Sequence, residues 1–142
     1  VNGGTVYEKG AGTTTTVRAT GGTYSTANTA TVTTIENTGA AVTLLGPVTT
    51  VTNEAGSVIV DAGNVTTWTH SGGTGSYRGV GTITTMVISN GCTVDFSGGS
   101  AACTITTLTL GPGCFINDPG NRVVVTNAIV RTSGGKLGIV AP

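Results

Sequence analysis

Two carboxylates, Asp95 and Asp118, have the spacing in this chain that most strongly suggests chemistry. They lie 23 residues apart, and two copies of a sequence repeat described below lie 22 residues apart, so stacked repeats would bring both side chains close together. Glycan-cleaving enzymes use a pair of carboxylates as general acid and as base or nucleophile. The segment 117–121, Asn-Asp-Pro-Gly-Asn, is more typical of a turn. We therefore expect a non-enzymatic protein with no catalytic residues.

A second candidate site is a group of aromatic and basic residues in or beside the longest insertion of the chain, 71–81. Its members are Trp68, His70, Tyr77 and Arg78. Aromatic side chains commonly anchor the recognition of a partner, so the group is a possible side-loop contact patch. The alternative is a solvent loop beside one large core residue. His70 is the only histidine, and no Cys or carboxylate stands at ligand spacing from it, so we expect it on the surface, with no metal site and no cofactor.

The composition indicates an all-β protein. Thr occurs 31 times, Gly 24 times and Val 18 times in 142 residues. Thr and Val favour a pleated backbone and Gly interrupts it. The six basic and six acidic residues are scattered and cancel, which argues against nucleic acid as a partner. No run of 18 apolar residues is present to cross a membrane, and no motif indicates a small-molecule substrate.

A four-residue signature recurs along the chain: Val or Ile, then Thr-Thr, then an apolar residue. Clear copies stand at 32–35, 48–51, 65–68, 83–86 and 105–108, with a weaker copy at 125–128 and a possible earlier one at 13–17. From 32 to 125, successive copies start 16, 17, 18, 22 and 20 residues apart. About ten residues after most starts comes a Gly followed by alternating apolar positions. Each period therefore predicts a strand, a turn at Gly and a second strand.

Two architectures have short strands at this interval. An antiparallel β-sandwich is one, but it gives no reason to repeat one signature in every period. A β-solenoid gives that reason, because equivalent side chains stack from coil to coil. We predict a single-domain parallel β-helix (β-solenoid) of about six or seven coils over residues 13–142, with a flexible N-terminal arm at 1–12 and the sandwich as the alternative.

The three cysteines provide a check on this register. Cys92 and Cys114 each follow a Gly and lie 22 residues apart, the interval between the signatures at 83 and 105. The solenoid would place them on adjacent coils, as a disulfide or as a stacked pair of small apolar residues. Cys103 has no intrachain partner in this scheme.

The segments "TITTMVISNGCTVDFSGG" and "CTITTLTLGPGCFINDPGNRVVVTNAIV" resemble β-helical virion proteins of tailed bacteriophages, most of all small capsid decoration (cement) proteins. The resemblance covers roughly residues 30–130 and lies in the style of the repeat, not in a functional motif. It implies a structural protein on the capsid surface, a homotrimer that binds the major capsid protein where coat subunits meet. Residues 1–12, with Tyr7, Glu8 and Lys9, are then expected to be a capsid-contact arm.

Two other functions remain open. One is a phage fibre or adhesive module that binds a receptor through the contact patch defined above. The other is ice binding through flat ranks of Thr-x-Thr. The rank two residues before the first Thr of each signature is broken at Pro47 and Asn64, which argues against ice binding.

Overall fold

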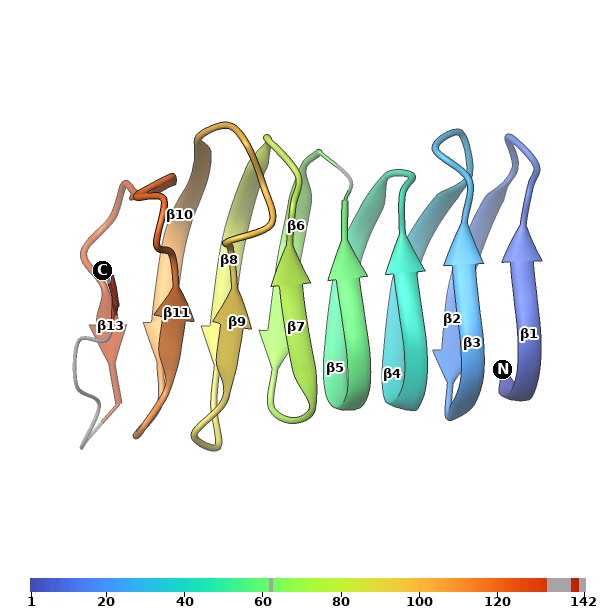
Figure 1. The fold of residues 1–142 in the computed structure, drawn as a ribbon, viewed down its shortest axis with the longest axis horizontal. Helices are drawn as coiled ribbons and strands as arrows, with labels where there is room; N and C mark the ends of the chain where they lie inside the picture. The colour runs from blue at the N-terminus through green and yellow to red at the C-terminus, as the bar shows by residue number, and fades with distance from the viewer. Residues whose placement is uncertain (62, 133–138, 141–142) are drawn as a thin grey trace.

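The computed structural model describes residues 1–61, 63–132 and 139–140, and the remainder of the predicted solenoid domain lies outside them. The chain is a single-domain, all-β solenoid of about seven turns. All its strands join one 14-stranded sheet, and every strand pairing in it is parallel. Figure 1 shows the coils side by side from β1 at one end to β13 at the other. The predicted β-helix is confirmed, and the antiparallel sandwich is wrong.

Each coil contributes a strand to two opposite faces, and β4 and β5 are long enough to bend around and serve both. The first face contains β2, the starts of β4 and β5, β6, β8, β10, β12 and β13; the second contains β1, β3, the ends of β4 and β5, β7, β9, β11 and β14. The strands are β1 (Asn2–Glu8), β2 (Thr13–Ala19), β3 (Gly21–Thr26), β4 (Thr31–Leu44), β5 (Val48–Val60), β6 (Val65–His70), β7 (Thr74–Tyr77), β8 (Thr82–Ile88), β9 (Thr93–Asp95), β10 (Cys103–Leu110), β11 (Phe115–Asn117), β12 (Val123–Val125), β13 (Val130–Arg131) and β14 (Ile139–Val140).

The signature sets the register of the first face. Its opening residue pairs with the same position of the next coil, as Ile83 does with Ile105 and Ile105 with Val125. Thr14 pairs with Val32, so the possible early copy at 13–17 is a true member of the stack. The fourth position is buried in every coil and forms one inward row: Val17, Ile35, Val51, Trp68, Met86 and Leu108.

The core is filled by inward rows from both faces, and large side chains on one face are matched by small ones on the other. Trp68 and His70 point inward from β6 and are completely buried. Opposite them on β7 stands Gly75, where an added Cβ would lie 2.8 Å from the His70 ring and 3.3 Å from the Trp68 ring. Gly75 is therefore required for close approach, because the core has no space for a side chain there.

A buried arginine holds the irregular side of three coils together. The Arg122 guanidinium donates to four backbone carbonyls, those of Tyr77 (3.1 Å), Gly79 (2.5 Å), Phe96 (3.0 Å) and Ala101 (2.8 Å). These carbonyls belong to the segments that follow β7 and β9, where the coils differ most in length. The arginine therefore replaces, for these loops, the regular hydrogen bonding that strands provide.

Space for this arginine depends on a glycine, and its loop depends on an aspartate. A Cβ on Gly99 would lie 1.8 Å from Arg122 Nη1. The buried Asp118 carboxylate accepts hydrogen bonds from the backbone N–H groups of Arg122 (3.1 Å) and Val123 (2.8 Å). The predicted turn after Asn117 is confirmed, since Asn121 N–H donates to Asp118 O.

The N-terminal segment is part of the stack, which corrects the prediction of a flexible arm over residues 1–12. β1 pairs in parallel with β3, with Val6 beside Tyr24 and Glu8 beside Thr26. The backbone of Val1 also bonds to the next coil, accepting from Thr20 N–H at 2.8 Å. The segment could not be recognised as a strand because its Gly-rich sequence lacks the signature.

We expect the Arg122→Met substitution to lower the free energy of unfolding by about 3 kcal/mol, because four inward-facing carbonyls lose their donor. The measurement is chemical denaturation at pH 7. Arg131→Met is the matched control, since Arg131 is exposed, and should change stability by less than about 0.5 kcal/mol. Equal stabilities for the two variants would contradict the structural role assigned to Arg122.

Candidate functional surfaces

The two carboxylates do not form a catalytic pair. Asp95 is half-buried on the outer side of β9, and its register partner on β11 is Asn117, not Asp118. Asp118 follows Asn117 and is directed inward to its backbone donors. The one-residue difference between 23 and 22 thus places the two carboxylates on opposite sides of the sheet.

Asp95 is also engaged by its neighbours. Its carboxylate accepts from Ser97 Oγ (2.8 Å), from Ser97 N–H (3.2 Å) and from Asn117 Nδ2 (2.6 Å). Burial acts to raise the pKa of Asp95, but these hydrogen bonds and the Arg78 charge outweigh it and leave the pKa below its ordinary value. A carboxyl group with a lowered pKa is a poor general acid.

Three of the four residues of the expected side-loop contact patch lie inside the protein. Trp68, His70 and Tyr77 have no exposed surface, and only Arg78 is exposed. Their rings pack together, with centroids 6.4 Å apart for Trp68 and His70, and 6.3 Å for Trp68 and Tyr77. The sequence prediction failed because it attributed these residues to a loop, whereas Trp68 fills the inward fourth position of the signature.

A buried polar ladder runs along one corner of the core, and sequence reasoning missed it. Asn37, Asn53 and His70 lie in register on β4, β5 and β6 and are completely buried. Asn37 Nδ2 donates to Asn53 Oδ1 (2.7 Å), while Asn53 Nδ2 donates to Gly72 O (2.6 Å) and lies 3.3 Å from His70 Nδ1. The signal was available, since all three residues stand five positions after the start of a signature.

The ladder fixes the protonation state of His70. Because Asn53 Nδ2 carries only hydrogens, His70 Nδ1 must accept, which places the proton of the neutral ring on Nε2. Nε2 and the Trp68 Nε1 have no hydrogen-bond partner among the described residues. Burial lowers the pKa of His70, and a backbone hydrogen bond at Gly73 opposes this only in part. A neutral, inaccessible imidazole of this kind is a structural group.

The expected arm residues have different roles from one another. The Glu8 carboxylate accepts from the hydroxyls of Thr14 and Tyr24 and so closes the first coil. Burial, with the Glu8 contact, raises the pKa of the Tyr24 hydroxyl. Tyr7 is 49% exposed, and Lys9 Nζ lies 5.7 Å from the centre of its ring. Tyr7 and Lys9 are thus available to a partner, whereas Glu8 is engaged internally.

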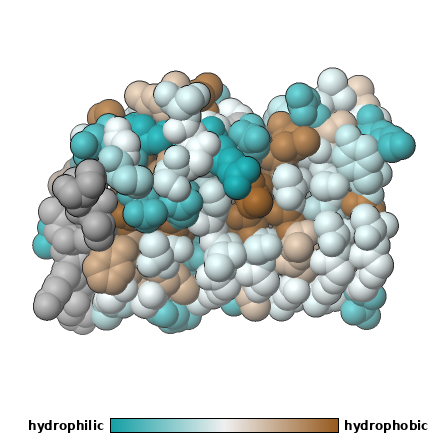
Figure 2. Space-filling model, viewed as in Figure 1, coloured by the Kyte–Doolittle hydropathy of each residue, from teal (hydrophilic) through white to brown (hydrophobic). Residues whose placement is uncertain are grey.

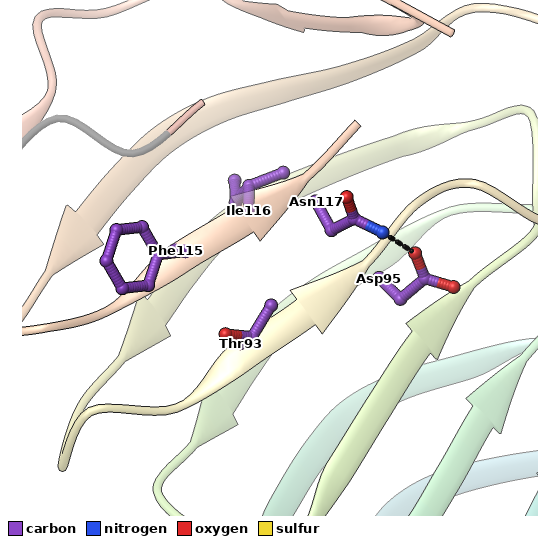
Figure 3. A pocket seen from close by; sticks show the side chains of 5 residues that line it. All are labelled: Thr93, Asp95, Phe115, Ile116 and Asn117. Atoms are coloured by element: carbon purple, nitrogen blue, oxygen red, sulfur yellow. Dashed lines mark hydrogen bonds between the residues drawn. The ribbon is translucent and has the colours of Figure 1, made fainter. Parts of the chain in front are cut away.

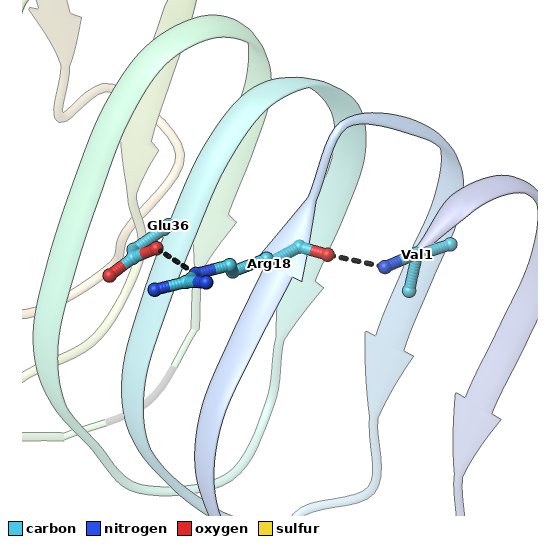
Figure 4. Close-up of polar contacts among 3 residues, drawn as sticks. All are labelled: Val1, Arg18 and Glu36. Carbon is cyan, nitrogen blue, oxygen red and sulfur yellow. Dashed lines mark hydrogen bonds and ion pairs between the residues drawn. The ribbon is translucent and has the colours of Figure 1, made fainter.

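The N-terminal end of the stack exposes an unpaired strand edge. Within the described residues β1 pairs only with β3, so its other edge is free. Val6 belongs to an inward row, yet it is 43% exposed because no coil precedes it. Beside this end, the Val1 amino group donates to Arg18 O, and Arg18 Nε lies 2.7 Å from Glu36 Oε2, an exposed ion pair (Figure 4).

The first face carries two regular ranks of outward side chains. The first rank contains Thr16, Thr34, Thr50, Thr67, Thr85 and Thr107. The second rank, two residues further along each strand, contains Arg18, Glu36, Thr52, Thr69, Val87 and Thr109. We call these two ranks the threonine array.

The threonine array differs from the rank considered in the sequence. Pro47 and Asn64 precede β5 and β6, so they lie outside the face and do not interrupt it. Parallel strands hold the array at about 4.8 Å between coils and about 6.6 Å between its two ranks. The unequal coil lengths are taken up in loops, so the array stays in register from β2 to β10.

The second face is less regular. Its outer surface is mostly pale, with small apolar patches among polar groups (Figure 2). A depression of about 360 Å³ lies over β9 and β11, lined by Thr93, Asp95, Phe115, Ile116 and Asn117. Figure 3 shows Asp95 and Asn117 turned toward each other in it, joined by their hydrogen bond. Because these two polar side chains bind one another, the depression offers no free group for chemistry.

All three cysteines are free thiols. The pairing of Thr93 with Phe115 sets Cys92 beside Cys114 on the neighbouring coil, as predicted from the 22-residue spacing. Cys92 is half-buried and Cys114 is buried. Cys103 is buried in β10, and this burial raises the pKa of its thiol.

Among residues 1–61, 63–132 and 139–140, no three His, Cys, Asp or Glu side chains gather into a possible metal site. The described part of the chain has no helix of the length and apolar character that crossing a membrane requires. No protein-family model matches the chain, and no curated protein or solved structure matches it either.

We expect stability to fall as the pH decreases from 7 to 5. The folded pKa of His70 lies below the unfolded value of about 6.5, so the unfolded state binds more protons in this range, and the loss should be about 1 kcal/mol. His70→Asn, which continues the ladder with a group that does not titrate, should remove this dependence. Chemical denaturation at both pH values tests it, and an equal pH dependence in the variant would contradict the assignment.

Proposed function

We propose that this chain is a non-enzymatic virion protein that decorates and stabilises a tailed-bacteriophage capsid. In this proposal it binds the major capsid protein at junctions between coat subunits, as a homotrimer on the capsid surface. The proposal is supported by the resemblance over residues 30–130. The observation that carries it is the unpaired edge of β1, because a protein that exposes a strand edge requires a partner to cover it.

The shape of β1 favours a specific partner over indiscriminate pairing. Gly3 and Gly4 have φ values of +89° and +73°, and the register with β3 shifts between Asn2 and Thr5. A bulge of this kind bends the strand and limits edge pairing. The edge that remains regular is Thr5–Glu8, where the exposed Val6 and Tyr7 lie. A short strand of a coat subunit that pairs there would bury both side chains.

Two exposed valines allow a matched test of this docking edge. Val6→Lys places a charge on the β1 edge and should reduce the amount of protein bound to capsids at least about tenfold, since lysine blocks edge pairing. Val80→Lys is the control, because Val80 is 62% exposed in a loop far along the chain. It should bind as the unmodified protein does.

The measurement is density-gradient sedimentation of particles from the native source, with mass spectrometry of each band, followed by rebinding of the two variants. Co-banding of the chain in high copy with coat protein is expected. A chain that stays away from particles, or Val6→Lys binding as well as Val80→Lys, would overturn the proposal. Native mass spectrometry of the purified chain tests the trimer. A fibre module would instead band at tail-like copy number, and it has lost three of its four candidate contact residues to the core.

A second candidate function, ice binding, is favoured by the threonine array. Three coils carry complete Thr-x-Thr pairs at 50–52, 67–69 and 107–109, and Val87 replaces one Thr with a side chain of similar shape. Hydroxyl and methyl groups held on a rigid two-dimensional grid can order water in the manner of an ice surface. The array has this grid over consecutive coils.

The ice-binding candidate predicts thermal hysteresis at millimolar protein concentration. Thr67→Tyr places a bulky ring in the middle of the threonine array and should remove most of the hysteresis. Thr43→Tyr is the control, because Thr43 is an outward, half-buried threonine on the second face, and it should keep the activity. No hysteresis in the unmodified protein, or equal losses in both variants, would reject this function.

A further inference from the structure

Cys92 and Cys114 close two turns of the same form on adjacent coils. Cys92 N–H donates to Ser89 O at 3.2 Å, and Cys114 N–H donates to Gly111 O at 3.2 Å. Each turn therefore returns to its strand in the same way, three residues after it begins. The two cysteines consequently project from equivalent points of the stack.

The contacts on both sides of the cysteine pair hold these turns against each other. Gly91 and Gly113 both have φ of +70°, and a Cβ on Gly113 would lie 3.6 Å from Gly91 Cα. On the other side, Phe115 N–H donates to Cys92 O at 3.1 Å. The two Cα atoms are thus separated by about the 4.8 Å strand spacing, which lies within the range of about 4.4–6.8 Å found in disulfides.

The thiols themselves occupy equivalent positions. Cys92 Sγ lies 3.9 Å from Asn90 O, and Cys114 Sγ lies 3.7 Å from Pro112 O, in each case the carbonyl two residues earlier. Both sulfurs are therefore on the same side of their turns. We propose that Cys92 and Cys114 are a covalent modification site, which a low-molecular-weight disulfide such as glutathione disulfide converts into a disulfide joining the two coils.

The reaction is thiol–disulfide exchange in two steps. The Cys92 thiolate, the more accessible of the two, attacks one sulfur of glutathione disulfide, breaks its S–S bond and releases one glutathione thiolate, which takes up a proton. The Cys114 thiolate then attacks Cys92 Sγ and releases the second glutathione. Two protein thiols are oxidised and one small disulfide is reduced to two thiols. Burial and the neighbouring Cys114 raise the pKa of Cys92, so the reaction should be faster at alkaline pH.

The disulfide would strengthen the part of the solenoid that has the shortest strands on its second face. β9 and β11, which follow the two turns, have three residues each, so few backbone hydrogen bonds join these coils. A covalent link between them would close a loop of about 22 residues and raise the melting temperature by several degrees.

Peptide mapping of the full chain after incubation with glutathione disulfide tests the inference. Mass spectrometry without reduction should find a peptide linked through Cys92 and Cys114, two hydrogens lighter than its parts, with Cys103 still a thiol. Cys103→Ser should form the same link, whereas Cys114→Ser should keep glutathione on Cys92. A link through Cys103, glutathione on Cys92 alone in the unmodified chain, or no reaction at alkaline pH would overturn it.

Discussion

The in-register parallel hydrogen bonding of successive coils is the constraint on which the rest of this structure depends. Each coil meets only its two neighbours, and equivalent residues come to lie about 4.8 Å apart. A side chain that suits one coil therefore suits the next, inward as an aliphatic row and outward as a threonine rank. The repeated Val/Ile-Thr-Thr-apolar signature is the sequence expression of this condition. It also explains how coils of unequal length coexist, since only the strands must match.

Polar groups test this constraint most severely at the corners, where the chain turns between faces and its backbone groups leave the ladder. Two solutions occur here. Asn37 and Asn53 repeat one hydrogen-bonding side chain from coil to coil, so the ladder that they form obeys the same stacking rule as the aliphatic rows. Arg122 instead reaches across three coils and satisfies four carbonyls with one side chain. The first solution suits coils of equal length, and the second suits the loops where the lengths differ.

The sequence predicted the parts of the fold that follow from repetition, and it failed where a single side chain decides. The solenoid, its register and the stacked position of Cys92 and Cys114 follow from intervals alone. The inward direction of Trp68 could be assigned only by aligning it with Ile35 and Val51, because its neighbours suggested a surface loop. Tyr77 and His70 failed for the same reason. The β1 strand could not be predicted, because its pairing is made by backbone groups that leave no pattern in the Gly-rich sequence.

The same constraint determines where a solenoid can bind other molecules. Along the faces every described strand between β3 and β9 has a neighbour on both sides, so a partner there can use only side chains. At the end, β1 offers unpaired backbone groups together with Val6, an inward-row side chain that the stack leaves uncovered. Backbone pairing at an edge selects a protein strand, whereas a rank of hydroxyl and methyl groups suits an extended, repeating surface. The end and the threonine array therefore favour different partners, and one chain can use both without conflict because they do not overlap.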